Sequence, residues 1–216
     1  MSIEEVREAA SHDRPKSAPK TDSPTGERQH TRDGVGPLYH RIYSIPVEST
    51  WENALRSMKR FQMNINGFSP QSMCRFEKRC GDSNLLKTGD EFQIHITGPW
   101  NGPVRVADAS ETCFTLVTLD GHMEAGEIQF RIKRENAEWV KFEIESLARS
   151  KDMLIDLVYD RLPIVRFAQT EMWTSVCESM GRELSWGRQG DPRGRIGDVE
   201  ILTEKRDEET GEWQTV

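Results

Sequence analysis

The sequence lacks any apolar run that approaches the roughly 20 residues needed to cross a bilayer as a helix. Residues 1–10 are acidic and helix-like, whereas a signal peptide has a basic segment followed by an apolar one. We therefore expect no membrane insertion and a cytoplasmic location. A Cys-x-x-Cys pair, common in structural zinc and dithiol sites, is also missing. We interpret the scattered cysteines as free, partly buried thiols; they are Cys74, Cys80, Cys113 and Cys177.

A surplus of positive charge is absent as well. The chain carries 29 Lys and Arg against 36 Asp and Glu, which gives a net charge of -7. A surface that binds nucleic-acid phosphates needs a concentrated basic patch. The charge balance therefore argues against a nucleic-acid partner and against broad attraction to anionic membranes. It gives no information on the oligomeric state.

Several kinds of catalytic and cofactor site are missing from the sequence. It has neither a nucleophile elbow nor an identifiable oxyanion loop, which argues against Ser-His-Asp and Cys-His catalysis. The glycines from Gly187 to Gly197 do not follow a strand and open a helix, as a dinucleotide-binding fingerprint requires. His40 and His95 have no third ligand at a convincing spacing, so we expect no metal site. We assign no catalytic residue and no cofactor.

The length suits one domain with a sizeable core, because domains commonly contain about 100 to 200 residues. Residues 1–36 are rich in charged residues, Ser, Pro and Gly and contain no aromatic residue, so we predict a disordered N-terminal tail. Residues 37–184 are predicted to form the folded domain. Residues 185–216 are Gly-rich, Arg-rich and then strongly charged, which predicts a mobile tail. Within it, Val199–Lys205 and Trp213–Val216 could pair as a hairpin.

Alternation of apolar and polar residues is the main strand signal in the folded domain. Leu38–Val47 alternates in this way and predicts a first strand. The same period of two recurs in four later segments, which are Phe92–Ile96, Val104–Val106, Ile128–Ile132 and Val140–Ile144. Such alternation predicts an antiparallel sheet with one covered face and one wetter face. Cys113–Leu119 is more apolar on both sides, so we expect it to be a central strand.

Helices are indicated by capping residues and by three- and four-residue steps. Thr50 and the two residues before it supply capping chemistry for a helix from Trp51 to about Phe61. Ser69-Pro70 predicts the start of a short second helix. A further helix is expected over Lys151–Tyr159, followed by a kink or a fresh start at Pro163. An amphipathic C-terminal helix that packs on the sheet is predicted from the stripe Val165, Ala168, Met172, Val176 and Met180.

Four short motifs resemble those of a known family. They are Pro103-Val104-Arg105-Val106, Thr118-Leu119-x-Gly121-His122-x-x-x-Gly126-Glu127-x-x-Phe130, Arg149, and Arg166-x-x-Gln169. Over about residues 37–184 the chain resembles the family named domain of unknown function 1990, which is similar to the START-like, or Bet v 1-like, superfamily. The resemblance implies an α+β helix-grip fold, in which a curved antiparallel sheet wraps around a long C-terminal helix. The chain departs from the family where it reads Ala148-Arg149-Ser150 in place of Ser-Arg-Pro.

His122 and Glu127 are the first candidate site residues. His122 follows Gly121 in a turn and Glu127 lies five residues later, so the pair could form a proton-transfer or hydrogen-bonding dyad at a pocket mouth. In the structural interpretation, which we favour, Gly121 and Gly126 provide turn dihedrals and His122 bonds the backbone. Glu127 then pairs with a cross-strand cation. The sequence leaves both interpretations open.

Three arginines that match the family motifs are the remaining candidates. The resemblance places Arg105, Arg149 and Arg166 on different elements, where a cavity fold could bring them together on an anionic ligand group or on Glu127. Ordinary ion pairs are the alternative. The predicted ligand-binding set is therefore Arg105, His122, Glu127 and Arg149.

The fold analogy favours binding of a small hydrophobic or amphipathic ligand in an interior cavity. Candidate lining residues are Phe92, Ile94, Phe130, Phe142 and Met172. Two alternatives stay open. One is a cyclase-, dehydratase- or isomerase-type enzyme with His122 as acid or base and Glu127 as its orienter, and the other is a protein-interaction domain without a ligand. A cavity of several hundred cubic ångströms would favour a ligand or a substrate, whereas a filled interior would favour an interaction role.

Overall fold

The structure, a computed structural model, describes residues 26–81, 84–96, 102–151, 163–186, 194–208 and 210–216, and only the backbone of residues 163–168. Within these ranges the strands form one antiparallel sheet in the order β2-β3-β4-β5-β6-β7-β1-β8-β9. The strands are β1 (Val35–Glu48), β2 (Cys74–Cys80), β3 (Glu91–Ile96), β4 (Gly102–Ala109), β5 (Cys113–Thr118), β6 (Glu124–Arg134), β7 (Trp139–Ser150), β8 (Glu200–Arg206) and β9 (Trp213–Thr215). The helical elements are η1 (Thr31–Asp33), α2 (Trp51–Met63), η2 (Ile65–Gly67) and α4 (Pro163–Ser185).

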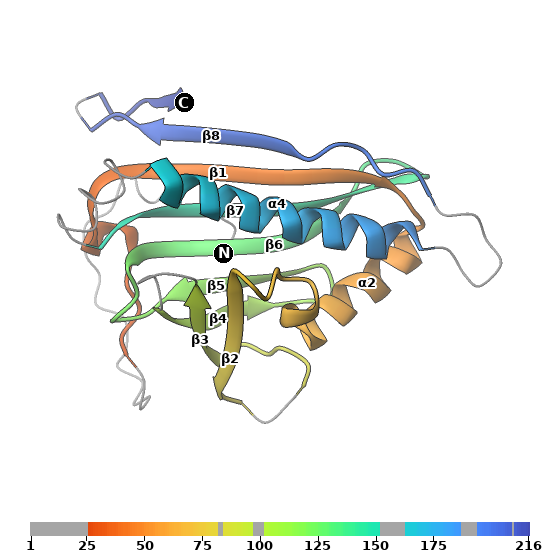
Figure 1. The fold of residues 1–216 in the computed structure, drawn as a ribbon, viewed down its shortest axis with the longest axis horizontal. Helices are drawn as coiled ribbons and strands as arrows, with labels where there is room; N and C mark the ends of the chain where they lie inside the picture. Colours follow the sequence, from red (N-terminus) through yellow and green to blue (C-terminus); the bar gives the residue numbers. More distant parts are fainter. Residues whose placement is uncertain (1–25, 82–83, 97–101, 152–162, 187–193, 209) are drawn as a thin grey trace.

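The sheet is curved, and α4 lies across its concave face (Figure 1). This arrangement confirms the predicted α+β helix-grip fold, with β5 in the central part of the sheet. The alternation seen in the sequence decides which side chains face α4, because successive residues of a strand point to opposite faces. No helix within the described ranges is both long and apolar enough to span a membrane.

Aromatic rings fill much of the space between the concave face and the helices. Phe114, Phe130 and Phe142 come from the neighbouring strands β5, β6 and β7, and none of the three is exposed. Phe61 of α2 inserts among them, with ring centroids 5.4 to 5.8 Å away. Trp173 of α4 closes the cluster at 5.6 Å from Phe130. Apolar contact between these elements therefore holds both helices on the sheet.

The predicted starts of α2 and α4 are confirmed, whereas the prediction of a short helix at Ser69-Pro70 is wrong. The Thr50 side chain accepts a hydrogen bond from the backbone N–H of Asn53 at the start of α2. Pro163 is the first residue of α4, where its missing N–H costs no helical hydrogen bond. The helix predicted from Ser69-Pro70 is only a single turn, because Cys74 and Phe76 bury alternate side chains and continue as β2. The helix expected over residues 152–159 lies outside the described residues.

The described fold begins earlier than we expected. Residues 26–36 belong to the predicted disordered tail, yet Gln29 is buried and its N–H donates to the carbonyl of Thr118 at 2.8 Å. β1 then starts at Val35. Buried polar groups hold this segment in place, and apolar periodicity does not detect such contacts. Residues 1–25 lie outside the described residues.

The C-terminal segment also differs from the predicted mobile tail, because it extends the sheet. β8 pairs with β1 from Tyr39↔Lys205 to Ser44↔Glu200, and β9 pairs with β8. The two strands are those that the sequence suggested for a hairpin. An isolated hairpin is marginal in water, whereas this one gains a third strand as its neighbour. Residues 187–193 and 209 lie outside the described residues.

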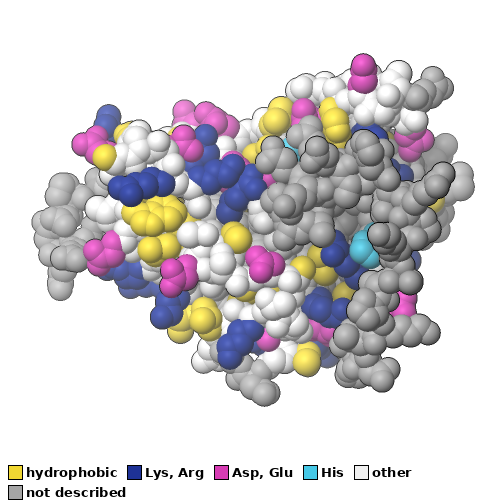
Figure 2. Space-filling view, turned by 180° about the vertical axis from the view of Figure 1, so that it is seen from behind, with side chains coloured by type: hydrophobic (Ala, Val, Ile, Leu, Met, Phe, Trp, Pro, Cys, Tyr) yellow, Lys and Arg dark blue, Asp and Glu magenta, His cyan; other side chains and the backbone are white. Residues whose placement is uncertain are grey.

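Charged side chains replace apolar ones on the convex face, which is turned away from α4. Figure 2 shows this face, with Lys and Arg side chains lying among Asp and Glu. Arg131 of β6 reaches across to β7, where its guanidinium lies 2.7 Å from Glu143 and 2.5 Å from Glu145. These cross-strand pairs satisfy groups that would otherwise be costly to bury.

His40 of β1 joins the C-terminal hairpin to this charged network. The side chain is 1% exposed, and its Nε2 lies 2.6 Å from Glu145 while its Nδ1 lies 2.7 Å from Glu204 of β8. The ring of Trp213 in β9 meets the imidazole edge-on, with centroids 5.9 Å apart. One buried side chain therefore contacts three strands.

We expect His40→Ala to lower the free energy of unfolding by about 1 to 3 kcal/mol, because Glu145 and Glu204 lose their shared buried partner while Glu145 keeps Arg131. Urea unfolding measures this loss. The matched control is His95→Ala, which removes a His–Glu contact of 2.8 Å with side chains 36% and 37% exposed. Its effect should be small, since exposed pairs contribute little. Equal losses in the two variants would contradict the role given to His40.

Candidate functional site

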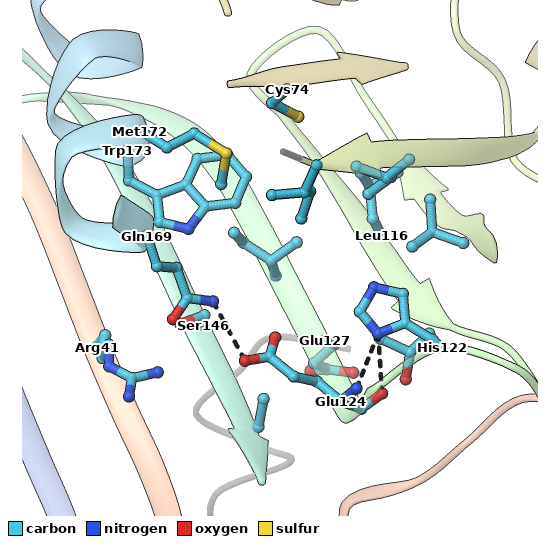
Figure 3. Close-up of a pocket in the computed structure, with 16 residues that line it drawn as sticks. Arg41, Cys74, Leu116, His122, Glu124, Glu127, Ser146, Gln169, Met172 and Trp173 are labelled. Carbon is cyan, nitrogen blue, oxygen red and sulfur yellow. Dashed lines mark hydrogen bonds between the residues drawn. The ribbon is translucent and has the colours of Figure 1, made fainter. Parts of the chain in front are cut away.

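A cavity of about 70 Å³ lies between α4 and the concave face of the sheet. Its apolar wall includes Ile94, Leu116, Met172 and Trp173. Polar side chains gather on the opposite part of the wall, and Figure 3 shows them below the Trp173 ring. We call this part the polar end, and it includes Arg41, His122, Glu124, Ser146 and Gln169. Thr118 and Glu127 are the other polar residues of the wall. The cavity therefore has an apolar part and a polar part.

The turn between β5 and β6 carries two residues of the polar end. Gly121 has a φ of 98°, a value that side chains other than glycine rarely adopt. The N–H of His122 donates to the Leu119 carbonyl at 2.9 Å and closes the turn. Because His122 lies in the turn and not in a strand, its side chain leaves the alternation of the sheet and lines the cavity.

The imidazole of His122 is held from two sides and is 8% exposed. The backbone N–H of Glu124 lies 3.0 Å from Nδ1, and this N–H can only donate. The Glu124 carbonyl lies 3.1 Å from the same Nδ1, but it already accepts from the side-chain amide of Gln29. We therefore assign Nδ1 as the acceptor and the proton to Nε2, which points away from Glu124 in Figure 3. A Cβ on Gly102 would lie 2.1 Å from Cδ2 of the ring, so only glycine leaves room for it.

Burial lowers the pKa of His122, although the neighbouring charge of Glu124 raises it in part. A neutral imidazole is therefore favoured at the polar end. The Glu124 carboxylate accepts a hydrogen bond from the Gln169 amide of α4 at 3.2 Å. Nearby, burial raises the pKa of Tyr43, whose hydroxyl bonds to Thr170 of α4. These side chains join the β5–β6 turn and β1 to α4.

Glu127, the predicted partner of His122, makes a different contact. Its Oε2 lies 2.6 Å from the guanidinium of Arg28, while Oε1 is buried without a hydrogen-bond partner. Burial raises the pKa of Glu127, and the charge of Arg28 lowers it in part. Glu127 borders the cavity, but the imidazole of His122 bonds the backbone of Glu124. The two predicted residues do not form a dyad.

Two of the predicted arginines, Arg105 and Arg149, do not line the cavity. Arg105 of β4 pairs with Glu91 at 2.7 Å and donates to the Gly26 carbonyl at 3.3 Å. Arg149 of β7 is partly buried, its Nε has no hydrogen-bond partner, and burial lowers its pKa. The side chain of Arg166 lies outside the described residues. The anion-binding interpretation requires Arg105 and Arg149 to meet at the cavity, and they do not.

Two of the five predicted lining residues, Ile94 and Met172, do line the cavity. Phe130 and Phe142 pack instead in the aromatic cluster, and Phe92 packs against Phe76. Arg41, Glu124 and Trp173 also line the cavity, although none of them was predicted from the sequence. Arg41 had a signal, because it alternates in step with the buried Tyr43 and Ile45 along β1.

The cavity offers neither a metal site nor a reactive thiol. No group of three His, Cys, Asp or Glu in the described part of the chain is arranged to hold a metal ion. All four cysteines are unpaired. Burial raises the pKa of Cys74, which lines the cavity, to about 12, so its sulfur is a thiol at neutral pH.

A second, wider hollow of about 810 Å³ lies on the surface between α2, the segment before β3 and the β4–β5 turn. Leu55 and Leu86 contribute apolar wall, and Lys59 and Lys87 contribute charge. It is open to solvent and contains none of the predicted site residues. The interior cavity is therefore the better-formed candidate site.

No curated protein matches this chain. Among solved structures, truncated norcoclaurine synthase from Thalictrum flavum matches with a TM-score of 0.48 and 9% identity, over 68% of this chain and 94% of that chain. A conserved protein from Geobacillus kaustophilus matches with a TM-score of 0.44 and 13% identity, over 67% and 94%. Ara h 8.0201 matches with a TM-score of 0.42 and 11% identity, over 66% and 95%.

One family model matches residues 46–179, a span that contains α2, strands β2 to β7 and most of α4. The span covers more than half of the chain and includes the turn that carries His122. Residues 26–34 and the β8–β9 hairpin lie outside it. The protein therefore belongs to the family described as domain of unknown function (DUF1990).

Proposed function

We propose that the protein binds a small amphipathic molecule in the cavity under α4. The observation that carries the proposal is the division of the cavity wall into an apolar part and a polar end. Ligand sites in proteins are mainly apolar, with a few polar groups that fix the orientation of the ligand. The apolar body of the ligand would lie against Leu116, Met172 and Trp173, and its polar group would meet His122.

The size of the cavity limits the ligand. Drug-sized ligands occupy pockets of about 300 to 1,000 Å³, whereas this cavity measures about 70 Å³. Part of the interior that such a ligand would need is occupied by the ring of Phe61 and its aromatic neighbours. We therefore limit the proposal to a ligand with few non-hydrogen atoms.

The polar end favours an uncharged polar group on the ligand. Glu124 contributes a carboxylate and Arg41 a guanidinium, so a ligand ion of either sign would meet one like charge. His122 presents Nε2–H as a donor. An alcohol matches these groups, because a hydroxyl both donates and accepts hydrogen bonds.

The enzyme alternative lacks the pair on which it was based. General acid or base catalysis by a histidine is assisted by a group that orients the imidazole. Here the orienting contact comes from the backbone of Glu124, and Glu127 is bound to Arg28. We therefore propose binding and not turnover.

The proposal can be tested with six-carbon probes that differ only in the polar group: 1-hexanol, hexylamine and hexanoate. Titration followed by NMR should give the tightest binding for 1-hexanol, with shifts at the methyl groups of Leu116 and Met172. Native mass spectrometry of freshly purified protein adds an unbiased search for a retained molecule. Failure of all three probes to shift cavity resonances would contradict the proposal.

We expect His122→Ala to weaken 1-hexanol binding by about 0.5 to 1.5 kcal/mol, the net contribution of one hydrogen bond between neutral groups. His95→Ala, which removes a histidine outside the cavity, serves as the control and should leave the affinity unchanged. Thermal melting of the same variants separates affinity from stability. A His122→Ala protein that melts earlier but binds 1-hexanol as tightly as wild type would reduce His122 to a structural residue.

We also expect the buried imidazole to make stability depend on pH. Burial lowers the pKa of His122, so below about pH 6.5 the unfolded chain binds a proton that the folded protein binds less readily. Above about pH 6.5 the imidazole is neutral in both states, so its titration does not lower the free energy of unfolding. Below that pH the free energy of unfolding falls, because only the unfolded chain readily takes up the proton. Wild type should lose more unfolding free energy than His122→Gln between about pH 7.5 and about pH 5.5.

Urea unfolding at the two pH values measures this difference. Glu127 acts in the opposite direction, because its raised pKa makes the folded protein bind a proton more readily as the pH falls. Both proteins contain Glu127, so its contribution cancels in the comparison. Equal losses in wild type and His122→Gln would show that the imidazole titrates normally in the folded state.

A further inference from the structure

Residues 26–34, which we call the strap, lie against the turn that carries His122 and Glu124. The N–H of Gln29 donates to the Thr118 carbonyl at 2.8 Å, and the N–H of Asp120 donates to the Glu27 carbonyl at 2.9 Å. These two bonds frame an antiparallel bridge between Arg28 and Leu119. The strap therefore continues the pairing of β5 at the point where the chain turns towards β6.

The side chain of Gln29 bonds directly to the polar end of the cavity. Its Nε2 donates to the carbonyl of His122 at 3.1 Å and to the carbonyl of Glu124 at 3.2 Å. Gln29 is 4% exposed, so these carbonyls have little access to water that could replace the amide. One side chain thus holds the backbone on both sides of Met123.

Two further contacts fix the strap on the sheet. The guanidinium of Arg28 lies 2.6 Å from Glu127, which pairs with Val117 at the end of the β5–β6 ladder nearest the turn. At the other end of the strap, a Cβ on Gly34 would lie 2.5 Å from the Ser150 carbonyl and 2.6 Å from Cγ of Arg149. The strap is therefore packed closely at both ends and is hydrogen-bonded to the turn between them.

We propose that the strap positions His122 and Glu124 in the cavity, with Gln29 as the positioning residue. Gln29 does not line the cavity, so it acts through the backbone of the turn. The effect on ligand binding rests on the proposed function. By linkage, a ligand that needs the ordered turn also stabilises the strap by the same free energy.

The test compares Gln29→Met with Gln62→Met. Both substitutions keep the side-chain length and remove a buried side-chain amide that donates to the backbone. Gln62 donates to the Ser110 carbonyl at 2.7 Å, at the opposite end of β5 from the turn with His122. NMR titration without any ligand measures the pKa of the His122 imidazole, which depends on how tightly the turn is held. The imidazole resonance is assigned by its absence from the spectrum of His122→Gln. Affinity for 1-hexanol is measured in parallel.

In Gln29→Met we expect the pKa of His122 to rise towards its ordinary value of about 6.5, because a loosened turn admits water to the imidazole. Affinity for 1-hexanol should fall about two- to tenfold, the factor that one lost hydrogen bond corresponds to. Gln62→Met should change neither quantity. If Gln29→Met does not melt cooperatively, Gln29→Asn takes its place, because its amide is one methylene too short to reach both carbonyls.

The two readouts separate the positioning role from the proposed function. An unchanged His122 titration in a folded Gln29 variant overturns the positioning role, whatever the probe does. A shifted titration in a series where even wild type does not bind 1-hexanol supports the positioning role and contradicts the proposed function. Equal shifts in the Gln29 and Gln62 variants would also overturn the proposal, because they would report general destabilisation.

Discussion

Burial of the Phe61 ring against the sheet is the contact on which the rest of the interior depends. Rings from β5, β6 and β7 surround it, and α2 reaches the sheet through this ring. Trp173 of α4 packs in turn on Phe130. Protein interiors are close-packed, so a cluster of this kind leaves little free space. It fills part of the volume under α4 and leaves a cavity of about 70 Å³ beside it. The same packing thus stabilises the fold and limits what the fold can bind.

The pleat of the sheet separates two kinds of chemistry. Side chains on the concave face are mainly apolar, whereas those on the convex face form ion pairs across neighbouring strands, as Arg131 does with Glu143. His122 reaches the cavity because it lies in a turn, while Glu127 lies within β6 and binds Arg28 of the strap. Both residues therefore border the cavity, but their functional groups bind different partners.

Buried polar contacts order the strap and help to order the C-terminal hairpin, whose Trp213 also packs against the small apolar cluster of Leu38 and Leu147. Gln29 and His40 are both almost fully buried, and each satisfies its partners on a neighbouring segment with hydrogen bonds of 2.6 to 3.2 Å. A buried polar group without a hydrogen-bond partner destabilises the folded state, whereas a satisfied one fixes the position of the segment that carries it. Highly charged segments can therefore join the sheet at defined positions, even though they contribute few apolar side chains.

The sequence by itself determined the antiparallel sheet, the face that each strand buries and the starts of α2 and α4, because alternation and capping are local properties of the chain. The helix-grip arrangement was what the resemblance to a family implied. It also identified the turn with His122, although the resemblance to a family contributed to that choice. Only the tertiary structure decided that Arg105 and Arg149 do not line the cavity, that Glu127 lines it while paired with Arg28, and that Glu124 and Arg41 belong to its wall. It alone showed that residues 26–36 are packed. The physical reason is that these outcomes depend on contacts between different elements, such as those of Arg28 with Glu127 and Gln29 with His122, 99 and 93 positions apart, which no local pattern encodes.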